Sequence, residues 1–420
     1  MSLLQESVLT QAKFQQYRST FEKLQGYIFA NHGRDYVHLG LIQFVNPLAA
    51  TRAKARKFLA QFGKELTTAW GLRLAYDLYQ KAKSAGLQDV QSKLKEPVVR
   101  AAGLSATGYK NLGLNTGSFD SAFLDGLAKR VQQKITIPTQ ETLDAILIMA
   151  GNDRTAMRRE QKKYSTQLRG VAKIRWEEGY INRSKEVIRE PFGFADNISQ
   201  PLFFKEEVPA NWSSTWDPTV QPNVILAPEL SAADPEELGS FLAYLQIQQD
   251  TEAMGKLVRA RAAMTGAKSV VIQQNRLVGR TLDGDPLVKV HGKDQNDFDF
   301  KSDPGFHQVP EYAHIRKANP RLDSTNRILR RGATYGEEPS GPHGTHFQCF
   351  QSNLRYGFEH VFKDWLLNPD HPTYGAGLDA ILAGNPYPPA RILAGEYFYF
   401  PSIPFFGRLA DPKFDGSRQA

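Results

Sequence analysis

Short runs of strand-forming residues alternate with helix-patterned segments, and the alternation recurs in both halves of the chain. In the first half, Tyr36–Phe44 is apolar and rich in strand formers, and Leu143–Gly151 is a continuous apolar run closed by a Gly-Asn-Asp turn. A charged, helix-patterned segment follows, and Ala172–Tyr180 is a further strand candidate. This part of the sequence therefore predicts strands and helices that take turns along the chain.

The second half repeats this plan. Ser240–Gln249 places Phe241 and Leu245 on one side at a period of two residues, as in a strand. His346–Ser352 is another strand candidate, and a segment with apolar residues at helical spacing, 354–366, comes directly after it. The pattern predicts an α+β fold of two ferredoxin-like halves with antiparallel sheets, residues 1–190 and residues 191–420.

Composition narrows the setting of this fold. No window approaches the ~20 consecutive apolar residues of a membrane span. The N-terminal segment MSLLQESVLT lacks the basic and apolar regions of a secretory signal. The single Cys349 excludes an internal disulfide. We therefore expect a cytoplasmic protein without a membrane partner.

The formal net charge of +8 raises the question of an anionic partner. The basic residues do not form one long block, and the densest run, 154–169, has the pattern of a solvated helix face. We therefore do not expect nucleic acid to be a partner. Basic residues placed around an anionic cofactor explain the charge better.

Common catalytic motifs are missing from the sequence. There is no P-loop, no Gly-x-Gly-x-x-Gly that opens a helix after a strand, and no Gly-x-Ser-x-Gly elbow. His343 and His346 have the spacing of part of a metal motif, but no carboxylate or thiolate ligand pattern accompanies them.

The segment 313–332, AHIRKANPRLDSTNRILRRG, combines one histidine with five arginines and one lysine. A neutral imidazole such as that of His314 can bind a metal, and Arg316 and Arg321 can hold carboxylates beside it. Haem has one iron and two propionates, and one proximal histidine is its common axial ligand, whereas zinc needs three or four protein ligands. The residues alone leave two readings open, a haem site and a basic surface loop.

Several segments, in order along the chain, resemble the dye-decolourising peroxidase (DyP) family. HIRKANPR followed by ILRRG resembles the proximal haem segment of that family, and FGFADNISQP resembles its Gly-x-x-Asp-Gly segment. Further likenesses are LQGYIF, GLSATGYKNLG, the GRTLDGDP turn, FQCFQSNLRYGFEHVFKDW and GEYFYFPS. The resemblance implies a fold like that of the dimeric α+β barrel superfamily, with haem in the C-terminal half.

The resemblance also implies functional residues. His314 would be the axial ligand of the haem iron, and Asp196 and Arg330 would face hydrogen peroxide on the opposite side. Apart from the resemblance, a metal-bound imidazole usually donates a hydrogen bond from its other nitrogen, and Asp379 is our candidate for the acceptor. The residues that would bind the cofactor, one haem b per chain, are His314, Arg316, Asn319, Pro320, Arg321, Asn197, Ile198, Ser199 and Phe347.

Two positions depart from the family pattern. Asn197 stands where the family has the second glycine of its segment; asparagine tolerates a left-handed backbone better than other residues with a side chain. Thr345 and His346 stand before Phe347, where aliphatic residues are usual. If Thr345 lines the pocket, that pocket is more polar than is typical.

The activity implied by the resemblance is a haem-dependent peroxidase that reduces hydrogen peroxide and oxidises small aromatic or dye-like substrates, favoured by acid. The alternative is a haem-handling, deferrochelatase-like protein with little turnover. Trp365 and Tyr397 are candidates to pass electrons to bulky substrates, although packing of the helix face and of the strand explains each of them better. An oligomer is compatible with the sequence.

Overall fold

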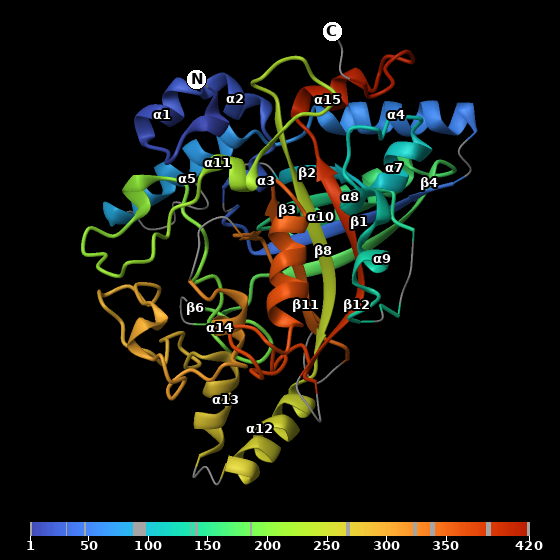
Figure 1. Ribbon diagram of the computed structural model, residues 1–420. Helices are drawn as coiled ribbons and strands as arrows, with labels where there is room; N and C mark the ends of the chain where they lie inside the picture. The colour runs from blue at the N-terminus through green and yellow to red at the C-terminus, as the bar shows by residue number, and fades with distance from the viewer. Residues whose placement is uncertain are drawn as a thin grey trace.

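In the computed structural model, eight antiparallel strands form a closed ring with helices around it (Figure 1). The structure describes residues 2–30, 32–45, 48–86, 98–135, 137–138, 142–184, 187–265, 269–321, 326–336, 341–383 and 388–417. Helix α4 (Ala49–Gly63) covers the outside at one end of the ring, and α12 (Thr251–Thr265) and α13 (Val270–Val278) project at the other.

The N-terminal half contributes four strands of the ring. They are β1 (Tyr36–Phe44), β2 (Val99–Leu104), β3 (Ala145–Gly151) and β4 (Ala172–Tyr180), and their order in the sheet is β2-β3-β1-β4. In this register Leu39 of β1 lies opposite Ile148 of β3 and Glu177 of β4. Strand β1 therefore runs through the middle of a four-stranded antiparallel sheet, as in a ferredoxin-like unit.

The C-terminal half repeats the arrangement. Its strands are β8 (Leu238–Gln249), β10 (Ala333–Tyr335), β11 (Gly344–Gln351) and β12 (Ala390–Phe400), in the order β10-β11-β8-β12. The first strand of each half thus lies between the third and the fourth. The predicted fold class of two ferredoxin-like halves is confirmed, while the boundary at residue 190 stays a prediction.

Two narrow junctions close the ring. Thr334 of β10 pairs with Tyr180 of β4, and Tyr399 of β12 pairs with Leu104 of β2. Side chains of both halves then share one apolar cluster inside the ring, which includes Leu39, Ile148, Leu242 and Phe350. Alternate residues of the same strands belong to a second cluster outside it, under the helices. Strands such as β1, β3 and β8 are therefore buried on both faces, whereas β4 is only partly buried.

The remaining elements flank or connect these strands. The helices are α1 (Gln11–Gln16), α2 (Arg18–Lys23), α3 (Gly26–Phe29), α5 (Ala69–Ser84), α7 (Ala106–Asn111), α8 (Ser121–Asp125), α9 (Leu127–Val131), α10 (Arg154–Gln167), α11 (Pro222–Ile225), α14 (His314–Ala318), α15 (Ile403–Arg408) and the π-helix η4 (Arg355–Leu366). The short pieces are η1 (Leu3–Gln5), η2 (Lys205–Glu207), η3 (Phe300–Ser302), β5 (Arg183–Ser184), β6 (Val187–Ile188), β7 (Ala227–Pro228) and β9 (Leu329–Arg330).

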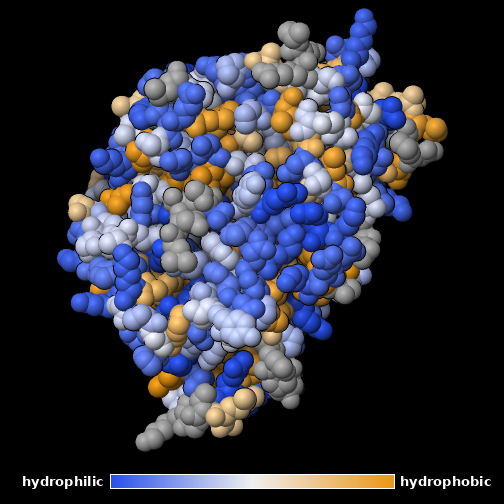
Figure 2. Space-filling model, viewed as in Figure 1, coloured by the Kyte–Doolittle hydropathy of each residue, from blue (hydrophilic) through white to orange (hydrophobic). Residues whose placement is uncertain are grey.

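Hydrophilic residues cover most of the face seen in Figure 2, and apolar residues lie there in small, separate patches. Among the helices of the described residues, none is both long and apolar enough to cross a membrane.

Candidate active site

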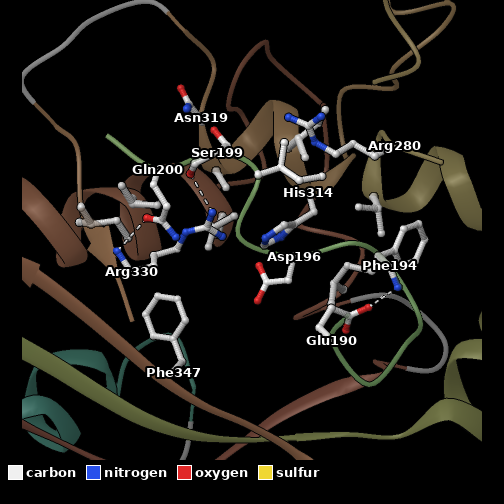
Figure 3. Close-up of a pocket in the computed structure, with 18 of the residues that line it drawn as sticks. Glu190, Phe194, Asp196, Ser199, Gln200, Arg280, His314, Asn319, Arg330 and Phe347 are labelled. Atoms are coloured by element: carbon white, nitrogen blue, oxygen red, sulfur yellow. Dashed lines mark hydrogen bonds between the residues drawn. The ribbon is translucent and has the colours of Figure 1, made fainter. Parts of the chain in front are cut away.

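A cavity of about 350 Å³ lies in the C-terminal half, where the turn 190–201 meets helix α14, strand β9 and the π-helix η4 (Figure 3). Its walls are largely apolar and come from β8, β11 and η4, through Leu245, Ile247, Phe347, Phe358, Val361, Phe362, Trp365 and Leu366. A π-helix is rare and often lies at a functional site. The polar residues of the cavity, described next, come from the turn, α14 and β9.

The turn presents Asp196 to the cavity. Backbone hydrogen bonds to other segments fix the turn: Asp196 N donates to Ile188 O at 2.8 Å, and Ala195 N donates to Leu282 O at 2.8 Å. The side-chain atom Asp196 Oδ1 accepts the N–H of Asn197 at 2.6 Å. Asn197 has a φ of 62°, in the left-handed region that a glycine adopts without cost. The asparagine thus preserves the sharp turn that follows the carboxylate.

The GRTLDGDP turn packs against this segment. Arg280 Nη1 donates to Gly284 O at 2.7 Å and closes its own turn. A Cβ atom on Gly284 would lie 2.1 Å from Cδ1 of Ile198, so only glycine admits the isoleucine here. The two motifs, more than eighty residues apart in the sequence, therefore form one wall of the cavity.

Glu190 organises the same turn and was not expected from the sequence. Its carboxylate accepts the N–H groups of Phe192 at 3.0 Å and Phe194 at 2.9 Å. Burial raises the pKa of Glu190 to about 7, with a further contribution from Asp196, against the hydrogen bonds that lower it. No sequence motif singles out this glutamate, because its burial arises only when the turn folds over β8.

Arg330 reaches the cavity from β9, which is held to β11 by the pairing of Arg330 with Cys349. Its Nη2 donates to Ser199 O at 2.8 Å, and its backbone N–H donates to Oε1 of Gln200 at 3.1 Å. Figure 3 shows the Arg330 and Asp196 side chains directed into the same space. Within the described part of the chain, no ion pair joins these two side chains directly, so a small molecule can contact both.

His314 begins helix α14 and faces the same cavity. Its Nδ1 lies 2.9 Å from Oδ2 of Asp379, and the other oxygen of that buried carboxylate accepts N–H groups of Ile381 at 3.0 Å and Leu382 at 2.9 Å. Burial lowers the pKa of the imidazole, but Asp379 outweighs it and the net shift is upward. With its proton on Nδ1, the ring keeps the Nε2 lone pair for a ligand in the cavity.

Lys317, one turn after His314, fastens the loop that leads to Asp379. It is fully buried, and its ammonium group donates to the backbone oxygens of Asn368 at 2.9 Å, Gly377 at 2.8 Å and His371. All three of its donors are thereby used. The helix that carries the histidine and the loop that carries its acceptor are therefore tied together.

Three arginines gather at one edge of the cavity, around Trp216 and Phe298. The Arg321 guanidinium lies 4.0 Å from the ring of Trp216 and 3.8 Å from that of Phe298, and Arg327 lies 4.5 Å from Trp216. Burial lowers the pKa of Arg321 to about 8, with help from Arg280 and Arg327. This concentration of positive charge favours a ligand with carboxylate groups at this edge.

Two residues expected at the cofactor lie elsewhere. Arg316 does not line the cavity, because its Nη2 pairs with the buried Asp303 at 2.8 Å and its guanidinium lies between the rings of Phe300 and Phe306. Pro320 is also absent from the lining. On the short helix that presents His314 to the cavity, Arg316 points away, and the expected role of Arg316 and Pro320 at the cofactor stays a prediction.

The other expected residues do line the cavity. They are Asp196, Asn197, Ile198, Ser199, His314, Asn319, Arg321, Arg330 and Phe347. Thr345 lines it as well, so the pocket has a hydroxyl where an aliphatic side chain is usual in the resembling family. The sequence did not point to Glu190, Gln249 and Arg327.

The donor set suits haem better than a bare metal ion. In the ranges that the structure describes, no group of three or more His, Cys, Asp or Glu residues could hold a metal. Haem needs only one histidine from the protein, because its macrocycle already ligates the iron. The single imidazole with an available Nε2 meets this need. The apolar slot suits the macrocycle, and the arginine-rich edge suits its two propionates.

Comparisons with known proteins agree with this chemistry. Residues 261–373 match the family model "Dyp-type peroxidase, C-terminal". The multifunctional dye peroxidase DyP2 of an Amycolatopsis species is 29% identical over 405 residues, which cover 78% of this chain and 87% of the relative. The crystal structure of an Anabaena DyP-type peroxidase superposes with a TM-score of 0.84 at 25% identity, over 97% of this chain and 98% of that one.

A shorter likeness concerns a second kind of protein. The deferrochelatase of Yersinia pestis is 39% identical over 93 residues, which cover 20% of this chain and 21% of that protein.

Proposed function

We propose how this chain, which belongs to the DyP-type peroxidase family and is a haem peroxidase, carries out its reaction. It binds one haem b in the cavity, with Nε2 of His314 as the axial ligand of the iron. It reduces hydrogen peroxide and oxidises small aromatic or dye-like molecules. The observation that supports this most is the placement of His314, Asp196 and Arg330 around one apolar cavity.

Haem supplies a redox-active iron when it is bound, and the chain supplies the ligand and the acid–base groups. Asp379 orients His314 and strengthens its donor character through the hydrogen bond to Nδ1. Arg321, Arg327 and Arg280 hold the propionates. Arg327 and Arg280 replace Arg316 in this part of the site.

Asp196 moves the proton of hydrogen peroxide. Its Oδ1 accepts the Asn197 N–H, so Oδ2 is left to take the proton. Oδ2 accepts the proton from one oxygen of hydrogen peroxide and passes it to the other oxygen, which then departs. The Arg330 guanidinium stabilises the negative charge that develops on the departing oxygen. Its bond to Ser199 O fixes the guanidinium toward the cavity before peroxide enters.

Trp365 is the better candidate for electron transfer to substrates too large for the cavity. It lines the cavity, and its ring stacks on that of His371 with 5.4 Å between the centroids and contacts that of the partly exposed His360 at 4.9 Å. Tyr397 is fully buried, and its hydroxyl donates a hydrogen bond to Glu359. We therefore assign Tyr397 to packing of the core and not to electron transfer.

The absorption spectrum of the purified, haem-supplemented protein tests this function. We expect a Soret band, and a shift of that band when hydrogen peroxide is added. A Soret band that does not respond to peroxide would favour haem handling, the activity named for the Yersinia relative. A protein that takes up no haem would contradict both functions.

A further inference from the structure

The cavity holds a second carboxyl group besides Asp196. Glu190 lies in the loop after β6, and its side chain faces the cavity beside Asp196 (Figure 3). Its carboxylate accepts three hydrogen bonds, from the N–H groups of Phe192 and Phe194 and from the amide of Gln249. These three donors are neutral, so none of them cancels the charge of an ionised Glu190.

A line of hydrogen bonds connects Glu190 to the opposite wall. Thr345 Oγ1 donates to Oε1 of Gln249 at 2.6 Å, and Nε2 of Gln249 donates to Oε2 of Glu190. Gln249 is the last residue of β8, and β11 places Thr345 opposite Ile247 of that strand. With Thr345 donating to the amide oxygen, the amide N–H of Gln249 points to Glu190.

We propose that Glu190, held by Gln249 and Thr345, is a second ionisable group of the peroxide cavity and that its charge governs how readily Asp196 takes the proton of hydrogen peroxide. The inference rests on the proposed function. Glu190 acts through Asp196 and is therefore a positioning residue.

The charges around the cavity give the direction of the effect. The titratable or charged side chains that line it besides Glu190 are Asp196 of the same turn, His314 of α14, Arg330 of β9, and Arg280, Arg321 and Arg327 at its edge. The residues of β8, β11 and β12 that line it are uncharged.

In the step concerned, the O–H bond of peroxide breaks, the proton goes to the Asp196 carboxylate, and a hydroperoxide anion remains. No electron moves. The negative charge thus leaves Asp196 and appears on the peroxide, where Arg330 stabilises it. An ionised Glu190 beside Asp196 repels the charge of that carboxylate, raises its affinity for the proton and favours the step. Because burial brings the pKa of Glu190 to about 7, its charge changes across neutral pH, so the rate rises as the pH rises.

The test uses the haem-loaded full chain and two readouts. Stopped-flow spectra give the rate constant of the reaction with hydrogen peroxide from about pH 5 to about pH 9. Infrared difference spectra over the same range follow the C=O band of the protonated Glu190 carboxyl. This second readout does not depend on turnover. We expect the rate constant and the infrared band to share one midpoint, with a several-fold slower peroxide reaction below it.

Variants of the hydrogen-bonded line separate this effect from a structural one. Gln249→Leu removes a donor to the carboxylate but leaves the Phe192 and Phe194 bonds, so the midpoint rises by about one pH unit. Thr345→Val frees the amide of Gln249 and moves the midpoint in the same direction by less. Glu190→Gln removes the infrared band. Thr334→Val, a neighbouring threonine outside the line and the cavity lining, serves as the matched control and leaves both midpoints unchanged.

Two results would overturn the inference. One is a pH profile that does not move in Gln249→Leu and Thr345→Val while peroxide still reacts, which leaves the proposed function intact. The other is an infrared spectrum without a titrating band. A loaded protein that shows the titration but never reacts with peroxide would contradict the proposed function, and the inference with it.

Discussion

His314 and Asp379 form a buried pair in which the imidazole Nδ1 lies 2.9 Å from the carboxylate Oδ2. Asp379 has no exposed surface, and backbone N–H groups hold its second oxygen. The pair therefore fixes both the ring orientation and the protonated nitrogen of His314.

The first prediction concerns this pair. Asp379→Asn should weaken haem binding roughly 10- to 100-fold, because partners behind a metal ligand contribute about that much. Haem titration followed by the Soret band measures it. The exposed pair His360 and Asp364 has the same 2.9 Å geometry, so Asp364→Asn is a matched control with unchanged affinity. Equal losses in both variants would deny Asp379 a specific role.

The second prediction concerns the peroxide side. Asp196→Asn should keep haem and slow the reaction with peroxide ~10²- to 10⁴-fold, because the proton acceptor is lost. Arg330→Leu should slow it ~10²- to 10³-fold, because the developing anion loses its cation. Stopped-flow spectra report both. Asp283→Asn, an exposed carboxylate paired with Arg189, should react like the unaltered protein. If both cavity variants also react at that rate, the roles proposed for Asp196 and Arg330 are wrong.

The third prediction concerns Lys317. Lys317→Met leaves three partly buried carbonyl oxygens without their donor, so the free energy of unfolding should fall by roughly 2–4 kcal/mol. Haem affinity should fall too, because the Asp379 loop loosens. Urea titration measures the first effect. Lys301→Met, on the surface, should stay within ~0.5 kcal/mol. A loss of stability as small as that of the control would show that the loop does not depend on Lys317.

The fourth prediction concerns Asn197, whose φ is 62°. Asn197→Ala should lower the free energy of unfolding by about 1 kcal/mol, because a Cβ without a compensating polar group is strained in this region. Asn197→Gly should equal or slightly exceed the unaltered protein in stability. Urea titration of both variants checks this order, and an alanine variant as stable as the glycine variant would contradict it.

The fifth prediction concerns acid. Burial lowers the pKa of His346 and His32 to about 3 and that of His38 to about 4. The unfolded chain binds these protons below about pH 6.5 while the folded chain does not. Stability is therefore full above that pH and falls as the pH drops, by up to ~1.4 kcal/mol per pH unit for each histidine. Burial gives Glu190 the opposite, smaller trend. Because its pKa is raised in the folded protein, its contribution to stability falls as the pH rises from about 4.5 to about 7.

Urea titrations between about pH 4.5 and pH 6.5 measure this slope. His346→Phe should reduce the slope by an amount that corresponds to nearly one bound proton. An unaltered slope in His346→Phe would show that this histidine is not neutral in the folded protein. The activity is expected to favour acid, which is the range in which the folded protein is less stable.

Local pattern was sufficient for several elements of the fold. Strands β1 and β4 begin and end at the residues that the sequence predicted. Such segments are recognised by the periodicity of their side chains, and this periodicity lies entirely within the segment itself. The duplication was visible for the same reason.

The sequence by itself determined the two halves, the α+β class and, through its motifs, His314, Asp196 and Arg330. Only the tertiary structure decided which basic side chains face the cavity, with Arg316 turned to Asp303 and Arg327 in its place. It also decided that the half-buried Glu190 lies beside Asp196 and that Gln249 and Thr345 join it. Burial, charge proximity and hydrogen-bond direction depend on strands and turns distant in sequence meeting at one place, which no local pattern records.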